Sequence, residues 1–219
     1  MSMEIKEDGF FWDGGGRQRV FEVFPEVHGD RRGFFCEIFN SSAPVPPGLE
    51  WFSDFSWVRQ ANRSASGPGV LRGMHAQRGA SCQGKLVSVP QGAVYDVICD
   101  MRPASETFGR VKAYWLDSRR QNMLWVPRGF LHGFCTFPGS GTTTFEYFCD
   151  NVYDKASETG VYPVSLMEAA GPDLRSMIGA MRSENGLNLS PKDAEAQNID
   201  EFSDAVRREY EASGRAWYE

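Results

Sequence analysis

The 219-residue sequence contains no long hydrophobic run. No stretch approaches the 18 or more consecutive apolar residues of a membrane span, so we expect no membrane partner. The first residues, MSMEIKEDGFFWDGGG, also lack the apolar core of a secretory signal. We therefore expect a cytoplasmic protein. Its length suits one large domain, or one domain with an appendage.

Positive charge is also scarce. The chain has 23 Lys and Arg against 29 Asp and Glu, which gives a formal net charge of −6. Binding to a phosphate backbone needs a broad basic surface, so the composition predicts no nucleic-acid partner. A small anionic ligand is compatible with this charge, because a few cations that line a cleft set the local potential.

The cysteines follow no recognised pattern. The chain has five of them, without a CxxC pair or a metal-ligand spacing. An odd number in a cytoplasmic protein indicates reduced thiols, most of them buried. The five are Cys36, Cys82, Cys99, Cys135 and Cys149.

Aromatic residues, glycine and proline are abundant, and together they favour short strands joined by tight turns. From residue 19 to about residue 153, alternating runs such as RVFEVF, GVLRGMHAQ and AVYDVICDM are separated by HGD, SGPG and PQG. Ten or so such runs, with no helical segment among them, predict an antiparallel sandwich or barrel of the all-β class.

The character of the chain changes after residue 153, where SLMEAAGPDLRSMIGAMRSENG mixes helix formers with breakers. The clearest helix is NIDEFSDAVRREYEASG near the end. Asp200 can cap it, and Gly214 can end it. Phe202, Val206 and Tyr210 share one face at a spacing of four residues.

The run GVLRGMHAQ places Arg72 and His75 among apolar residues and glycines. Side chains three positions apart in a regular strand point to opposite faces. If both residues serve one pocket, the strand must be irregular between them, and Gly73 is where a bulge would be tolerated. The alternative is an edge strand with a surface arginine and a half-buried histidine.

Neighbouring runs add further polar groups. QANRS places Gln60, Asn62 and Ser64 in alternation on one face, as in a solvated face or a wet cavity. Other runs contribute single groups that could do chemistry. Together the runs supply a base, a cation and a phenol on neighbouring predicted strands, from QGKLV with Lys85, PRGFLHGF with His132 and FEYF with Tyr147.

These motifs resemble those of the dTDP-4-dehydrorhamnose 3,5-epimerase family, whose members are sugar-nucleotide epimerases with a cupin-like jelly roll. QANRSAS and GVLRGMHAQ are similar to the family signature. The resemblance runs from about Asp30 to Asp193 in the family's order. It includes DRRGFFCE, QGKLV, AVYDVICDMR followed by SETFG, VPRGFLHGF, Tyr147 to Tyr153, and LSPKDA.

The resemblance implies an all-β, cupin-like jelly-roll barrel with short C-terminal helices. The expected organisation is an N-terminal arm at 1–18, a catalytic barrel at 19–155, and an irregular and helical extension at 156–219 that contributes Asp193 to the site. It also implies a homodimer in which N-terminal strands, near RVFEVF, reach into the neighbouring barrel and cover an open sheet edge.

The activity that the resemblance implies is inversion of C3, C5 or both in a nucleotide-linked 4-keto-6-deoxyhexose, with dTDP as the expected nucleotide and no cofactor. His75 would be the base, oriented by Asp193. Lys85 would stabilise the enolate oxygen, and Tyr147 would be the acid on the opposite face. The expected substrate-binding residues are Arg32, Phe35, Glu37, Gln60, Asn62, Arg72, His132 and Tyr153.

Other interpretations are open at this stage. The chain could be a 3,4-ketoisomerase acting on the same substrate class, or a sugar-nucleotide binding protein without activity. Tyr147 could be a core aromatic, Asp193 a helix-capping or loop carboxylate, and Lys85 a residue whose amine extends to solvent from a strand end.

A metal site is not expected. PRGFLH resembles the second half of a metal-binding cupin signature, but MHAQ has one histidine where the first half needs two and a glutamate. The chain also departs from the family after residue 160. It lacks the W-x-D-P-x-L and W-P segments, and we expect that difference to lie at the pocket rim.

Overall fold

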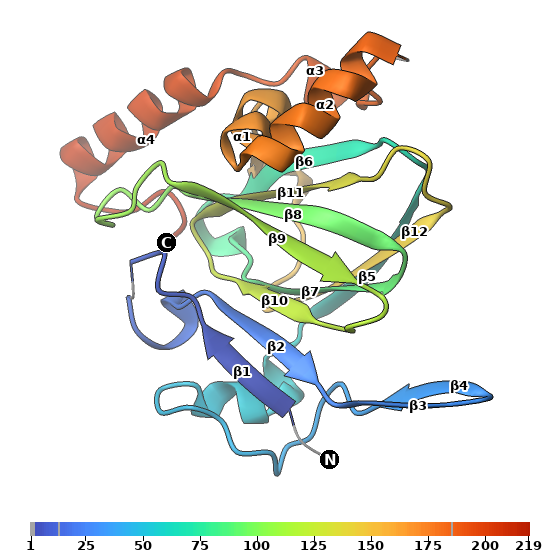
Figure 1. Ribbon diagram of the computed structural model, residues 1–219. Helices are drawn as coiled ribbons and strands as arrows, with labels where there is room; N and C mark the ends of the chain where they lie inside the picture. Colours follow the sequence, from blue (N-terminus) through green and yellow to red (C-terminus); the bar gives the residue numbers. More distant parts are fainter. Residues whose placement is uncertain (1–2, 13, 185) are drawn as a thin grey trace.

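The computed structural model describes residues 3–12, 14–184 and 186–219. Two antiparallel sheets face each other as a flattened barrel (Figure 1). The six-stranded sheet runs in the order β1 (Met3–Glu7), β2 (Phe21–Pro25), β10 (Met123–Val126), β7 (Lys85–Gln91), β12 (Thr143–Cys149) and β5 (Gln60–Ser66). The five-stranded sheet runs in the order β13 (Glu158–Gly160), β6 (Leu71–Gln77), β11 (Phe130–Thr136), β8 (Ala93–Asp100) and β9 (Val111–Asp117). This architecture confirms the predicted all-β class.

An apolar core fills much of the space between the two sheets. Val87 and Phe145 come from the six-stranded sheet, and Ile98 and Phe134 from the five-stranded sheet. The rings of Phe134 and Phe145 stack with their centroids 4.3 Å apart. Because successive strand residues point to opposite faces, each strand can supply this core and an outer surface at once.

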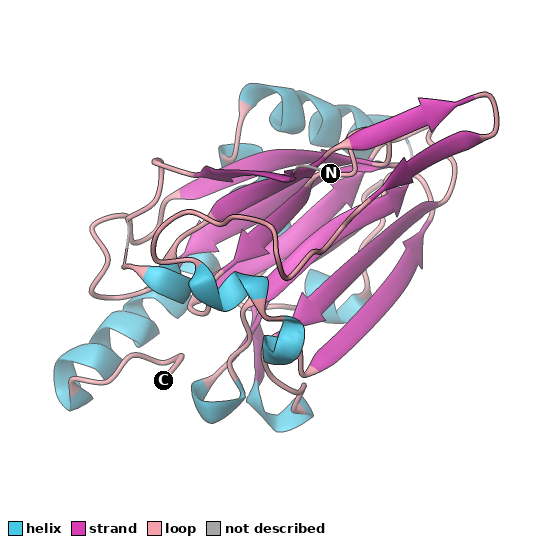
Figure 2. Ribbon diagram, turned by 90° about the horizontal axis from the view of Figure 1, so that it is seen from below, coloured by secondary structure: helices cyan, strands magenta, loops and turns pink. Residues whose placement is uncertain are grey.

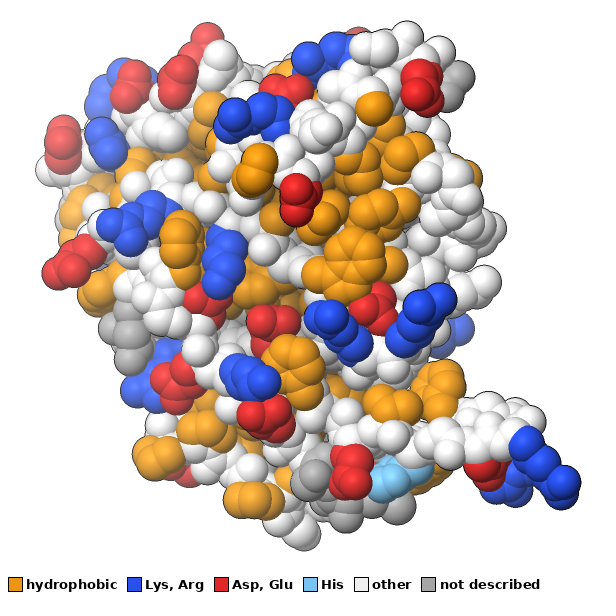
Figure 3. Space-filling model, in the orientation of Figure 1, with side chains coloured by type: hydrophobic (Ala, Val, Ile, Leu, Met, Phe, Trp, Pro, Cys, Tyr) orange, Lys and Arg blue, Asp and Glu red, His pale blue; other side chains and the backbone are white. Residues whose placement is uncertain are grey.

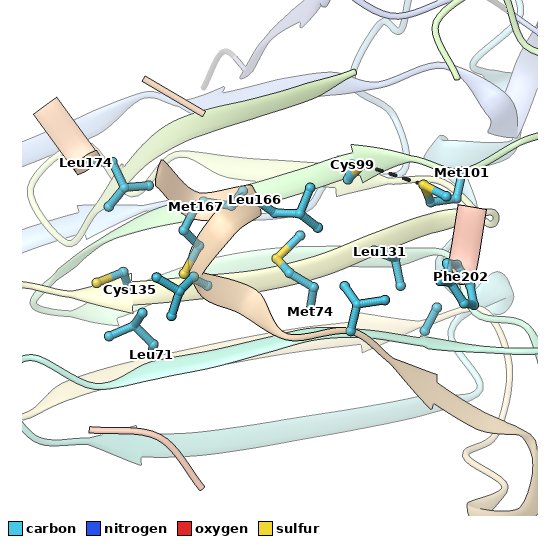
Figure 4. Packing of buried hydrophobic residues seen from close by; sticks show 14 of the residues in the cluster. Leu71, Met74, Cys99, Met101, Leu131, Cys135, Leu166, Met167, Leu174 and Phe202 are labelled. Carbon is cyan, nitrogen blue, oxygen red and sulfur yellow. Dashed lines mark hydrogen bonds between the residues drawn. The ribbon is translucent and has the colours of Figure 1, made fainter. Parts of the chain in front are cut away.

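Helices cover the outer face of the five-stranded sheet, which is apolar as well. They are α1 (Pro163–Ala169), α2 (Pro172–Glu184) and α4 (Ile199–Ser213), and the short α3 (Pro191–Ala194) lies in the connection between α2 and α4. Figure 4 shows Met74 and Leu131 of the sheet beside Leu166 and Met167 of α1 in this second core, which also includes Phe202 of α4. The segment of mixed helix formers and breakers is thus ordered by burial of its apolar side chains.

Helix α4 confirms the expected apolar face, with Phe202 and Val206 buried and Tyr210 partly buried. Its end is also confirmed, because Gly214 adopts the left-handed conformation. The predicted cap is wrong. The side chain of Asn198 accepts the hydrogen bond from the Asp200 amide, so Asp200 lies in the first turn. Either residue type can cap, and the tertiary packing selected the earlier start.

Most predicted strands are present, with a few differences. The chain before the QANRS run forms two 3₁₀ turns, Glu50–Ser53 and Phe55–Trp57, and the Asp54 side chain caps the second turn. HGD is part of strand β3 (Val27–Asp30), which pairs with β4 (Gly33–Cys36) in a separate hairpin. The three-residue β13 had no alternation long enough to reveal it.

The expectation that residues near RVFEVF complete a partner's sheet stays a prediction, but β2 itself is paired on both sides. Strand β2 pairs with β1 on one side and with β10 on the other, both within the chain. Its ladder positions are therefore already occupied. The segment that projects from the body is instead the β3–β4 hairpin (Figures 1 and 2).

All five cysteines are free, as expected. Four are buried, and Cys36 is partly exposed. Burial raises the pKa of Cys82 to about 11 and that of Cys99 to about 12, so these thiols stay protonated at neutral pH. Among the described residues, no helix is both long and apolar enough to span a membrane.

Candidate active site

A cavity of about 590 Å³ opens between the two sheets. Its walls come from β6 and β11 on one side and from β5, β7 and β12 on the other, and residues 188–193 close one end. Nine of the twelve predicted site residues line it: Gln60, Asn62, Arg72, His75, Lys85, His132, Tyr147, Tyr153 and Asp193.

Strand β6 is irregular at the position that the sequence suggested. Arg72 pairs with Phe134 of β11, whereas His75 pairs with His132, so three steps on β6 match two on β11. Gly73 lies in this bulge at φ +108°, and a Cβ there would come within 2.5 Å of the Gly133 Cα. Because of the bulge, Arg72 and His75 both line the cavity.

The His75 imidazole is paired with a carboxylate from the C-terminal extension. His75 Nε2 lies 2.6 Å from Asp193 Oδ1. Helix α3 presents Asp193, and the Ser190 side chain caps that helix by accepting a hydrogen bond from the Asp193 amide. A proton held on Nε2 by the carboxylate leaves Nδ1 as the basic nitrogen.

The environment of Asp193 keeps it ionised. Burial alone would raise the pKa of this carboxyl group, but the hydrogen bond and charge of His75 and the Ser190 hydroxyl together lower it. An ionised Asp193 is the form that stabilises an imidazolium as it develops on His75.

A second histidine–carboxylate pair lies beside the first. His132 Nε2 is 2.8 Å from Asp96 Oδ1, and His132 is the cross-strand neighbour of His75. Asp96 is fully buried, and burial raises its pKa against the opposing effect of His132. The sequence analysis missed Asp96. The sequence did contain a sign of it. Asp96 lies two residues from both Val94 and Ile98, so it shares their inward face of a predicted strand, where a carboxylate needs a partner.

The opposite wall carries a cation and a phenol. The Lys85 Nζ lies 6.0 Å from the centroid of the Tyr147 ring. Burial is the main cause that raises the pKa of Tyr147, and the charge of Arg72 opposes it. The phenol therefore keeps its proton at neutral pH. His75 and Tyr147 belong to the two facing sheets, so the cavity has an imidazole on one wall and a protonated phenol on the other.

Hydrogen bonds and an ion pair connect the side chains at the rim of the cavity. Gln60 accepts a hydrogen bond from the Tyr153 amide at 2.7 Å and donates to Asn62 at 2.9 Å. The Tyr153 hydroxyl donates to Glu158, which also pairs with Lys192 at 2.5 Å. Glu158 lines the cavity, and no periodic pattern in the sequence pointed to it.

Three predicted binding residues lie elsewhere. Arg32 and Phe35 are on the projecting β3–β4 hairpin, and Glu37 follows it. The hairpin is exposed, with 85% of the Arg32 side chain and 56% of Phe35 accessible to solvent. Its basic tip extends beyond the body in Figure 3. None of the three residues lines the cavity of its own chain.

The departure from the family after residue 160 does not lie at the pocket rim, contrary to expectation. Helices α1 and α2 pack on the outer face of the five-stranded sheet, and none of their described residues lines the cavity. The rim comes from residues 153–158 and 188–193. Across the described parts of the chain, no group of three or more His, Cys, Asp or Glu side chains is arranged to hold a metal ion.

Comparisons with known proteins identify the family to which this chain belongs. A family model described as dTDP-4-dehydrorhamnose 3,5-epimerase matches residues 18–201. The chain belongs to this family. The enzyme of that name from Escherichia coli K12 is 40% identical over 185 residues, which cover 84% of this chain and 91% of the relative.

Solved structures of 3,5-epimerases acting on dTDP-linked sugars have the same fold. A structure from Elizabethkingia anophelis has a TM-score of 0.70 at 33% identity, covering 92% of this chain and 98% of its own. A Legionella pneumophila epimerase in complex with dTDP-4-keto-L-rhamnose has a TM-score of 0.70 at 32% identity, covering 90% of this chain and 93% of its own. The cupin-like jelly roll and an isomerase of the epimerase type, both expected from the sequence, are thus confirmed for this family member.

Proposed function

We propose that this family member inverts C3, C5 or both in a dTDP-linked 4-keto-6-deoxyhexose. The observation that carries the proposal is the pairing of His75 with Asp193 on one wall of a cavity whose other wall presents Tyr147. Inversion of a carbon requires removal of a proton from one face and return of a proton to the other. His75 on one wall and Tyr147 on the facing wall can serve these two steps.

In the proposed reaction, His75 Nδ1 takes the proton from the carbon next to the ketone. The C–H electron pair forms the enolate, whose negative charge rests on the C4 oxygen. Lys85 and His132 are the donors available to that oxygen. Tyr147 then donates its proton to the opposite face of the carbon, the ketone re-forms, and proton exchange with solvent restores His75 and Tyr147.

Binding of the nucleotide diphosphate is assigned to the arginine at the start of β6. Arg72 donates to Ser66 at 3.0 Å, which orients its guanidinium, and that group is exposed where the cavity opens. A planar guanidinium matches phosphate oxygens with two donors. Gln60 and Asn62 on the facing strand supply amides to the same cavity.

The homodimer is part of this proposal. An exposed hairpin with two phenylalanines at 56% exposure is costly for a monomer in water. We assign Arg32, Phe35 and Glu37 to the nucleotide site of the partner subunit, since they lie away from their own cavity. The location is proposed to be cytoplasmic, which suits five free thiols.

Solvent exchange tests the reaction. The wild-type protein is incubated in D₂O with dTDP-4-keto-6-deoxyglucose, and deuterium at C3 and C5 is followed by NMR together with the configuration of the product. Incorporation with inversion supports the proposal and identifies the carbon. A ketone displaced to C3 would instead identify a 3,4-ketoisomerase, and the absence of exchange with dTDP-, UDP-, GDP- and CDP-linked substrates would exclude both.

Subunit mixing tests the hairpin. The variant His75→Asn keeps its hairpin, and the variant Arg32→Ala/Phe35→Ala keeps its base. If the hairpin serves the partner, a mixture of these two inactive proteins regains activity, because one site of each mixed dimer is complete. No recovery after verified subunit exchange, or a sedimentation mass of one 24.5 kDa chain, would refute the assignment.

A further inference from the structure

The edge strand β13 lies directly against the catalytic imidazole. Gly160 is the register partner of His75, and the Val161 amide donates to the Met74 carbonyl at 3.0 Å. A Cβ added to Gly160 would be 2.7 Å from His75 Cδ2 and 2.9 Å from the Met74 oxygen. Non-bonded carbon atoms pack at about 3.5–4.0 Å, so this position has no room for a side chain.

Backbone conformation does not explain the glycine. Gly160 lies outside the positive-φ region that favours glycine, in contrast to Gly73. The requirement at Gly160 is therefore one of space beside the His75 ring.

Neither partner in this contact can move away easily. The His75 ring is held by Asp193 on its Nε2 side. The backbone at Gly160 is held from behind by Gln197, whose side chain donates to the Gly160 carbonyl at 3.3 Å and whose own carbonyl accepts from the Tyr162 amide at 2.9 Å. Gln197 follows α3, so the segment that carries Asp193 also holds β13 against His75.

We propose that Gly160 is a positioning residue. Because glycine has no side chain, β13 can pack directly against the His75 ring and keep that ring at hydrogen-bonding distance from Asp193. Gln197 holds β13 in this position. The inference rests on the proposed function of His75 as the base. A methyl group at residue 160 would displace the ring and lengthen its bond to Asp193, while Arg72 at the other side of the bulge stays in place.

The test compares Gly160→Ala with Gly67→Ala, because Gly67 has an ordinary φ and a Cβ added there would have nothing within 4 Å. For Gly160→Ala we expect kcat to fall roughly 10²-fold, the loss typical of a displacement of about 1 Å, with KM and the Kd for dTDP unchanged. Gly67→Ala should behave as wild type. The double variant Gly160→Ala/Gln197→Ala should regain part of the lost kcat, because β13 can then move back.

A spectroscopic readout separates this inference from the reaction itself. The proton between His75 Nε2 and Asp193 should give a downfield ¹H resonance that is absent in His75→Asn and shifted or lost in Gly160→Ala. If the wild type shows that resonance and Gly160→Ala perturbs it, positioning stands even if no sugar nucleotide exchanges. An unchanged resonance and kcat, a rise in KM alone, or a Gly160→Ala protein that does not fold would each overturn the proposal.

Discussion

His75 Nε2 and Asp193 Oδ1 lie 2.6 Å apart, although 118 residues separate them in the sequence. The histidine is on a barrel strand, and the aspartate is on a one-turn helix in the C-terminal extension. The site therefore forms only when the extension docks on the barrel. Substitutions of single residues on each wall, and in each histidine–carboxylate pair, can separate their contributions.

Removing the His75 imidazole should slow exchange without affecting binding. For His75→Asn we expect deuterium incorporation at the sugar carbons to slow by about 10²- to 10⁴-fold, because positioned proton transfer contributes that much. Calorimetric titration with dTDP should give the wild-type Kd, since the arginine that is assigned to the diphosphate is intact. Exchange at the wild-type rate would exclude His75 as the base.

Removing the phenol should separate exchange from inversion. In Tyr147→Phe, the base can still take the proton and return deuterium to the same face. We expect deuterium incorporation to continue while the inverted product falls at least about tenfold, as seen by NMR of the product. An equal loss of both would mean that Tyr147 takes part in proton removal instead.

The Asp193 carboxylate should contribute to stability in a pH-dependent way. Its pKa is lowered in the folded state, so its stabilisation is present above the pKa of the unfolded carboxyl group and is lost as the pH falls through the folded value. The Tm of Asp193→Asn should lie below that of wild type at pH 7, and the gap should close below about pH 4. A gap independent of pH, measured by calorimetry, would contradict this assignment.

The contribution of the Asp96 carboxyl group to stability should depend on pH in the opposite direction. Burial raises its pKa, so its contribution is most favourable at low pH and is lost as the pH rises through the folded value. The Tm difference between Asp96→Asn and wild type should therefore shift in favour of the variant from about pH 4 to about pH 8. A shift in the other direction would mean that His132 outweighs the burial of Asp96.

A buried ion pair outside the cavity should be structural. Arg102 is fully buried beside Asp100 and also donates to the carbonyls of Trp12 and Gln18, which ties the N-terminal segment to the barrel. Arg102→Ala leaves the Asp100 charge unpaired and should lower the free energy of unfolding by about 3–5 kcal/mol. Urea denaturation measures this loss, and the Kd for dTDP of the folded fraction should stay unchanged.

Local patterns were sufficient for most of the barrel. Turn residues on either side mark β6, β8 and β11, because short apolar runs between SGPG, PQG or PRG and the next turn favour strands. The bulge at Gly73 was also predictable, since two ionisable side chains three apart cannot share a face otherwise. The short β13 was not predictable, because three residues are too few to show an alternating pattern. The cap of α4 was not predictable either, because more than one residue near its start can cap the helix.

The sequence by itself determined the residue types of the site: a base, a phenol, a lysine and an arginine on strands of one barrel. The family resemblance also pointed to Asp193, whereas only the tertiary structure added Asp96, assigned each group to a wall, and placed the β3–β4 hairpin away from its own cavity. The physical reason is that strand periodicity is a local property, whereas the pairing of His75 with Asp193 and the contact of Gly160 with the imidazole depend on where the extension packs. That packing is set by the apolar surface shared by the helices and the outer face of the five-stranded sheet.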